Sequence, residues 1–138
     1  ICWIQTDDGA MTDQSNCMLL AAIPGKVGDG GKITVRNEMD TKTAEQTSFI
    51  GETLGDARLR RFLVAPKGAE VTGICETPDG RAIFVNIQHP GEATKAADMA
   101  AGTYQSSWPG NAGYGPNTGR PRSATIVITR DDGGIVGA

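Results

Sequence analysis

The chain has 138 residues, a length that suits one ordinary domain and excludes a multidomain protein within this stretch. Leu, Ile, Val and Phe (5, 11, 7 and 3 residues) together lie close to the ~20% level below which chains struggle to build a core. Intrinsic disorder would also need a high net charge, and the formal charge is only -3. The composition therefore predicts part of a larger fold.

The residue types favour strands and turns over helices. Ile and Val far outnumber Leu, and the chain contains 19 Gly and 7 Pro. No apolar run approaches the ~18 residues that span a bilayer, which argues against a membrane span. The mild acidity and the lack of a Lys/Arg stripe argue against a nucleic-acid partner. The sequence starts at Ile1 without a leader, so we expect any targeting peptide to lie upstream or to have been removed.

In chain order, the first predicted strand covers residues 1–6 and ends in the acidic turn Asp7-Asp8-Gly9. Residues 17–23 and 33–36 flank a Gly-rich loop and are predicted to form a hairpin or meander. Residues 41–55 give no clear prediction, and residues 60–64 form a short strand.

The strongest local signal is a hairpin made by residues 70–76 and 82–87 around Thr77-Pro78-Asp79-Gly80. Proline presets one turn position and glycine supplies a positive φ. Two-residue alternation assigns one face of the second arm to Ile83, Val85 and Ile87, and the other to Phe84, Asn86 and Gln88. We expect both faces to have neighbours, with the Ile83 face packed against a second sheet.

The C-terminal third combines a long loop with one more strand. Residues 91–120 are rich in Gly, Pro, Ser and Ala and predict a loop with a helical turn near residues 96–101. Residues 123–130 predict the last strand, which is closed by an Asp-Asp-Gly-Gly turn before Ile135 and Val136. Short strands joined by such turns are typical of blade arrays. The predicted class is all-β, a β-propeller fragment of about two antiparallel blades.

The three cysteines, Cys2, Cys17 and Cys75, lack the paired spacing of structural zinc sites. Two states are open: a Cys2–Cys17 disulfide, or buried free thiols.

Few residues carry obvious chemistry. His89 is the only histidine, which argues against a histidine metal cluster or a Ser-His-Asp triad, and it could simply bond to the backbone at its turn. Most acidic residues precede glycines and fit turns. Glu70 differs because it opens an apolar strand, a place where calcium finds oxygen ligands. A solvated strand-end carboxylate is the alternative for Glu70.

Several blocks, taken together, resemble the C-terminal part of the PhoX-type alkaline phosphatases. They follow the family's order and span nearly the whole chain, with only residues 8–59 loosely matched. The blocks are Trp3-Ile4-Gln5-Thr6-Asp7, Arg61-Phe62-Leu63-Val64, Glu70-Val71-Thr72-Gly73, Thr77-Pro78-Asp79-Gly80, Phe84-Val85-Asn86-Ile87-Gln88-His89-Pro90-Gly91-Glu92, Ser106-Ser107-Trp108-Pro109, Pro121-Arg122-Ser123 and Asp132-Gly133-Gly134. Ala69 stands where many relatives carry cysteine.

The resemblance implies a bacterial β-propeller phosphomonoesterase that is exported to the periplasm or secreted and uses calcium and iron. It implies that residues 1–138 are a single unit, the C-terminal portion of a larger propeller, whose upstream blades carry the cysteine iron ligand and the phosphate-contacting arginine. Glu70 and Asp7 are the predicted metal ligands, and Gln88 and His89 are predicted to contact a small phosphate ester. The isolated piece is predicted to be inactive. A non-catalytic propeller that serves as a binding or scaffold module is the alternative function.

Overall fold

A computed structural model describes residues 1–7, 15–39, 42–110 and 119–138. Within these ranges the chain is built almost wholly from strands: β1 (Cys2–Gln5), β2 (Met18–Ala22), β3 (Gly31–Met39), β4 (Lys42–Ile50), β5 (Leu59–Val64), β6 (Glu70–Glu76), β7 (Ala82–Gln88) and β8 (Ala124–Thr129), with one short helix, α1 (Ala96–Ala100). The all-β prediction is confirmed. No helix in the described part of the chain combines the length and the apolar character that crossing a bilayer demands.

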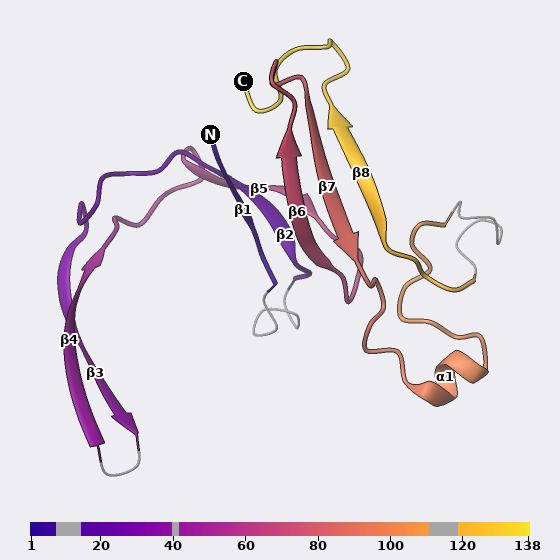
Figure 1. Cartoon of the computed structure of the whole chain (residues 1–138), viewed down its shortest axis with the longest axis horizontal. Coiled ribbons are helices and arrows are strands. Elements are labelled where there is room, and N and C mark those ends of the chain that lie inside the picture. Colours follow the sequence, from indigo (N-terminus) through magenta and orange to yellow (C-terminus); the bar gives the residue numbers. More distant parts are fainter. Residues whose placement is uncertain (8–14, 40–41, 111–118) are drawn as a thin grey trace.

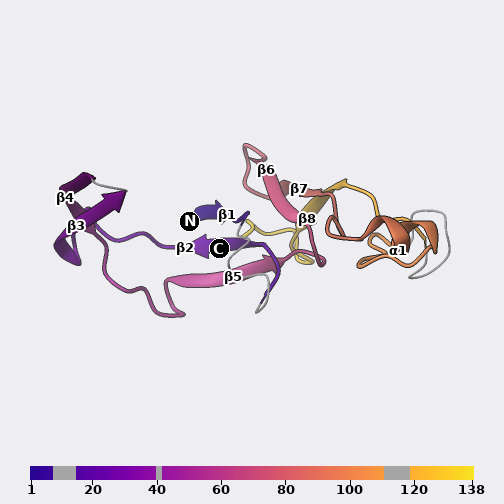
Figure 2. The same ribbon diagram turned by 90° about the horizontal axis from the view of Figure 1, so that it is seen from below.

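Two three-stranded antiparallel sheets form the body, with strand orders β1-β2-β5 and β6-β7-β8 (Figures 1 and 2). They match the expected two blades, although in the described part of the chain each has three strands rather than the four of a typical blade. The predicted acidic turn after β1 lies mostly outside the described residues, since only Asp7 of that turn is described.

The core lies where the two sheets meet. Leu19 of β2 packs in one cluster with Val71 of β6 and with Ile83, Val85 and Ile87 of β7, and all five side chains are at most 2% exposed. Burying an aliphatic side chain of this size contributes about 1.5–3 kcal/mol to folding. The predicted packing of the Ile83 face on a second sheet is confirmed.

The β6–β7 hairpin forms at the predicted turn. The Thr77 hydroxyl donates to the Asp79 carboxylate, which also accepts the Arg81 N–H. The hydrogen bond from Thr77, followed by that from Arg81, holds the pKa of Asp79 below its usual value, so the carboxylate stays ionised in the turn. After β8 the chain returns to this turn, where the Val136 N–H donates to the Gly80 carbonyl.

Strands β3 and β4 form a separate two-stranded hairpin that extends away from the body (Figure 1). The prediction that residues 17–23 and 33–36 pair with each other is therefore wrong. Residues 18–22 pair with β1 and β5, while β3 pairs with β4 over its whole length. The Gly-rich loop at residues 28–31 leads into the arm instead of closing a β2–β3 turn.

The outward face of β7 departs from the expectation that both faces have neighbours. Phe84 is 38% exposed, and Asn86 and Gln88 are exposed as well. Val127, the cross-strand partner of Phe84 on β8, is 55% exposed. This outer surface is uncovered in the described part of the chain.

None of the three cysteines forms a disulfide. Only Cys17 is buried, while Cys2 and Cys75 are exposed, so the disulfide does not form and the buried-thiol alternative holds for one residue of three.

Strand β6 has a bulge at Gly73, where the β6–β7 register shifts between Thr72 and Ile74. Glycine allows the bulge because the φ of Gly73 is +50°. A Cβ here would lie 2.4 Å from Asn86 Nδ2, and Asn86 in turn accepts a hydrogen bond from the Thr125 hydroxyl. We expect Gly73→Ala to lower the free energy of unfolding by about 1–2 kcal/mol, from φ strain and from moving the Asn86 side chain out of its hydrogen bond with Thr125. Urea denaturation measures this loss.

Gly102→Ala is the matched control for this test. Gly102 has a similar φ of +73°, and a Cβ there would meet no atom within 4 Å. The control should lose only the strain, about 1 kcal/mol. Equal losses in the two variants would contradict a packing role for Gly73.

Candidate metal-binding and active site

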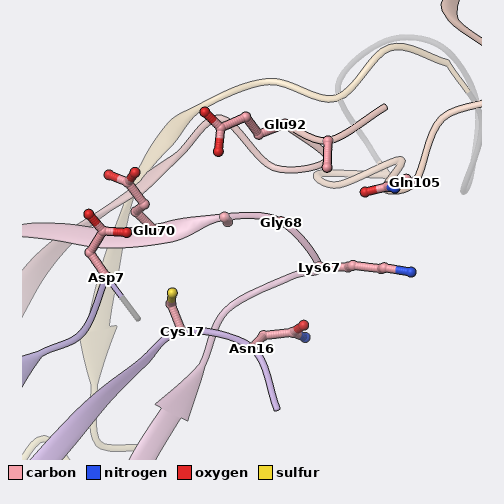
Figure 3. Close-up of a pocket in the computed structure, with 10 residues that line it drawn as sticks. Asp7, Asn16, Cys17, Lys67, Gly68, Glu70, Glu92 and Gln105 are labelled. Atoms are coloured by element: carbon pink, nitrogen blue, oxygen red, sulfur yellow. The ribbon is translucent and has the colours of Figure 1, made fainter. Parts of the chain in front are cut away.

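A pocket of about 320 Å³ opens where the end of β1 meets the starts of β2 and β6. Among the residues that the structure describes, three carboxylates line it, those of Asp7, Glu70 and Glu92. In Figure 3 the Asp7 and Glu70 carboxylates gather at one side and Glu92 points toward them. Three donor-bearing side chains, Lys67, Asn16 and Gln105, occupy the other side (Figure 3). We call this the acidic pocket.

Strand pairing brings Asp7 and Glu70 to this place. Thr6 continues the β1–β2 ladder by donating its N–H to Met18 and accepting the Met18 N–H at its hydroxyl. This fixes the chain just before Asp7, which is exposed. Glu70 is the first residue of β6 and is 24% exposed. The two carboxylates therefore lie at strand ends, as predicted, and share one pocket.

The loop after β7 is tied to the turn before β6. The Gly91 N–H donates to the Lys67 carbonyl at 2.8 Å. Gly68 permits this approach, because a Cβ on it would lie only 3.1 Å from the Gly91 nitrogen. This contact between two segments about twenty residues apart places His89 and Glu92 beside Glu70.

His89 joins two of the carboxylates. Its Nε2 lies 3.2 Å from Glu70 Oε1, and its Nδ1 lies 3.6 Å from Glu92 Oε2. The 3.6 Å separation is too long for a hydrogen bond, and Nδ1 is a buried atom without a hydrogen-bond partner among the residues that the structure describes. The ligand atoms of Glu70, His89 and Glu92 all lie within 4.8 Å of one another, close enough to hold one ion. Asp7 shares the pocket but is not part of this group.

His89 also has a strained backbone. Its φ is +32°, a value rare for a residue other than glycine, and its N–H donates to the Ser123 hydroxyl at 2.9 Å. Such strain persists where the surrounding structure over-determines it, and it clusters at functional sites.

Comparison with known proteins gives this site a context. The family model described as alkaline phosphatase PhoX matches residues 2–91. The chain belongs to this family. The match contains both Asp7 and Glu70, and it ends at Gly91, one residue before Glu92. The resemblance stated from the sequence is confirmed.

A solved PhoX structure is also similar: Pseudomonas fluorescens PhoX in complex with vanadate, a transition state analogue. Sequence identity is 34% and the TM-score is 0.43, and the match covers 83% of this chain. The chain spans only 19% of that protein. No curated protein matches the chain.

In this PhoX family member, one residue predicted for the site lies outside the acidic pocket, and two residues that line the pocket were not predicted. Gln88 pairs with Glu70 across β6 and β7, yet its exposed side chain lines a different hollow together with Thr72 and Asn86. Gln88 is thus not brought into the acidic pocket, and substrate contact by Gln88 and His89 stays a prediction. Glu92 and Lys67 were missed as site residues. The His-Pro-Gly-Glu turn was the available signal for Glu92, because it turns the chain back beside His89.

Proposed function

We propose that this chain is the part of a longer PhoX-type phosphatase that supplies carboxylate ligands to a calcium site used in phosphomonoester hydrolysis. The observation that carries the proposal is the meeting of Asp7, Glu70 and Glu92 in one pocket of a PhoX family member. Carboxylates gathered in one pocket repel one another unless a cation lies among them. Their convergence therefore favours a cation site over unrelated surface carboxylates.

The donor set fits the metals that the family resemblance implies. Carboxylate oxygens are the ligands that calcium prefers, and an imidazole nitrogen suits iron better than calcium. The buried, unpartnered Nδ1 of His89 is an atom that a bound metal would satisfy. We therefore assign Asp7, Glu70 and Glu92 to calcium, with His89 beside them.

The residues of this chain would have two roles, holding the cation and contacting the phosphate ester. A bound cation supplies positive charge that offsets the charge of the phosphoryl group. Glu70, half-buried and fixed at the first position of β6, holds that charge in place. Lys67, Asn16 and Gln105 line the other side of the pocket, and the Lys67 and Asn16 side chains point away from the carboxylates (Figure 3). Their N–H groups are proposed to turn toward phosphate oxygens when substrate binds. Gln88 and His89 are proposed to contact the substrate from the rim.

The site is proposed to be incomplete in residues 1–138 alone. Calcium takes 6–8 oxygen ligands, more than these carboxylates provide unless every one binds through both oxygens. The chain covers 19% of the related PhoX structure, so it corresponds to a small part of that protein. Its place as one unit, the C-terminal portion of a larger propeller, belongs to the proposal. Upstream blades would then supply the remaining calcium and iron ligands. Family membership likewise supports export to the periplasm or the medium.

The test compares the isolated chain with the longer protein on a chromogenic phosphate ester, para-nitrophenyl phosphate. We expect the longer protein to hydrolyse the ester in calcium and to lose activity when a chelator removes the metal. The isolated chain should give no turnover above buffer. Turnover by the isolated chain would contradict its incompleteness, and turnover that survives chelation would contradict the calcium role. Inactivity of both would favour a scaffold or binding module.

A further inference from the structure

A second pocket, of about 270 Å³, adjoins the acidic pocket. The two pockets share Glu92. His89 lines the second pocket while its Nε2 contacts Glu70 of the first. We call the second one the rim pocket. The His89–Glu92 pair therefore lies at the boundary between the two pockets.

The rim pocket has apolar walls. Pro90 is buried, Pro121 is half-buried, and the Met99 side chain is 45% exposed although it is apolar. The Tyr104 ring adds an aromatic surface. Flat organic rings bind to walls of this kind, which are typical of small-molecule pockets.

Two polar groups in the rim pocket have no partner among the residues that the structure describes. The Arg120 guanidinium and the Tyr104 hydroxyl make no hydrogen bond or ion pair there. The hydroxyls of Thr94 and Ser123 are used differently, since Thr94 bonds to Gly91 and Gln105, and Ser123 accepts the His89 N–H. Arg120 thus offers a free fork of donors that matches a carboxylate.

The loop that forms the rim pocket is held in place before any ligand binds. Thr94 is only 6% exposed, and its hydroxyl donates to the Gly91 carbonyl at 2.6 Å and accepts the Gln105 N–H at 3.1 Å. Gly91 is itself bonded to Lys67 of the acidic pocket. Both pockets are therefore built on one connected framework, and a preformed pocket avoids the cost of ordering a loop on binding.

We infer that the rim pocket binds the alcohol part of the phosphate ester and selects a flat ring that bears a carboxylate. This inference rests on the proposed function, which places the phosphoryl group in the acidic pocket. The ring lies against Pro90, Pro121 and Tyr104, and the carboxylate pairs with Arg120. The substrate class is that of aryl or heteroaryl phosphates with an acidic substituent.

The test measures binding of the free alcohol rather than turnover. Para-hydroxybenzoate and phenol are titrated into the longer, chelator-treated protein, and binding is followed by calorimetry or by ligand-observed NMR. We expect wild type to bind para-hydroxybenzoate about tenfold more tightly than phenol, as one charge-assisted bidentate pair provides. Arg120→Gln should abolish this preference, and Tyr104→Ala should weaken binding of both compounds.

Arg61→Gln is the matched control, because Arg61 lies on β5 and lines neither pocket. It should behave as wild type. An unchanged preference in Arg120→Gln, or no binding of either compound to wild type, would overturn the inference. Because the metal is removed, a negative result here leaves the proposed calcium site untouched, and failure of that site would leave the binding preference measurable.

Discussion

If the proposed calcium site exists, Glu70→Gln in the longer protein is expected to lower calcium affinity and ester hydrolysis by at least about a hundredfold. Even outer-shell changes at metal sites cost 10–100-fold. Glutamine keeps the shape of the side chain and an oxygen that can still face His89 Nε2, 3.2 Å away in the wild type. What it removes is the negative charge of the least exposed carboxylate of the Glu70–His89–Glu92 group. Calcium stoichiometry and ester hydrolysis measure the two losses separately.

Glu76→Gln provides the control, because Glu76 is the exposed last residue of the same strand and lines neither pocket. Its calcium content and activity should equal those of wild type. Thermal unfolding in chelator should give similar midpoints for both variants, while added calcium should raise the midpoint of Glu76→Gln and of wild type only. Undiminished metal content and activity in Glu70→Gln would show that Glu70 is no ligand.

Val85→Asp is expected to unfold the body of the chain. Val85 is 0% exposed at the centre of β7, between β6 and β8, and belongs to the cluster shared by both sheets. An unpaired buried carboxylate costs several kcal/mol, on the order of the whole stability of a domain. Far-UV circular dichroism and urea titration of the purified variant would show loss of the cooperative transition.

Asn86→Asp places the same charge one residue further along β7, on the exposed face. It keeps the oxygen that accepts the Thr125 hydroxyl. A change within about 1 kcal/mol is expected, as for most surface substitutions. Similar stability of the two aspartate variants would contradict the assignment of Val85 to the core.

The parts of the fold that could be predicted depend on short-range signals. Residues 70–88 combine a Pro-Asp-Gly turn with alternation on both sides, so the β6–β7 hairpin and its buried face followed from the sequence. Strand β2 instead pairs with β5, about forty residues later, and no local pattern encodes such a partner. The Gly-rich loop at residues 28–31 signals a turn but not which strands it connects.

Prediction of the site residues was likewise limited to those with local sequence signals. Glu70 and Asp7 could be singled out because both occupy family-like motifs at predicted strand ends. Glu92 could not be found by that reasoning, since it follows a strand by four residues and reaches the pocket only because Gly91 bonds to Lys67. Contacts between two loops are set by tertiary packing, which strand-end arguments do not contain.

The β3–β4 arm and the two packed sheets are expected to unfold with different free energies. Its side chains are mostly exposed, and its cross-strand contacts, such as Lys32 over the Phe49 ring and Thr34 with Thr47, lie within the arm itself. An isolated two-stranded hairpin is at best marginally stable in water. We therefore expect amide hydrogens of the arm to exchange through local opening, whereas those of the central strand β7 exchange only when the shared core opens. A single free energy of unfolding describes the two packed sheets and leaves the arm out of account.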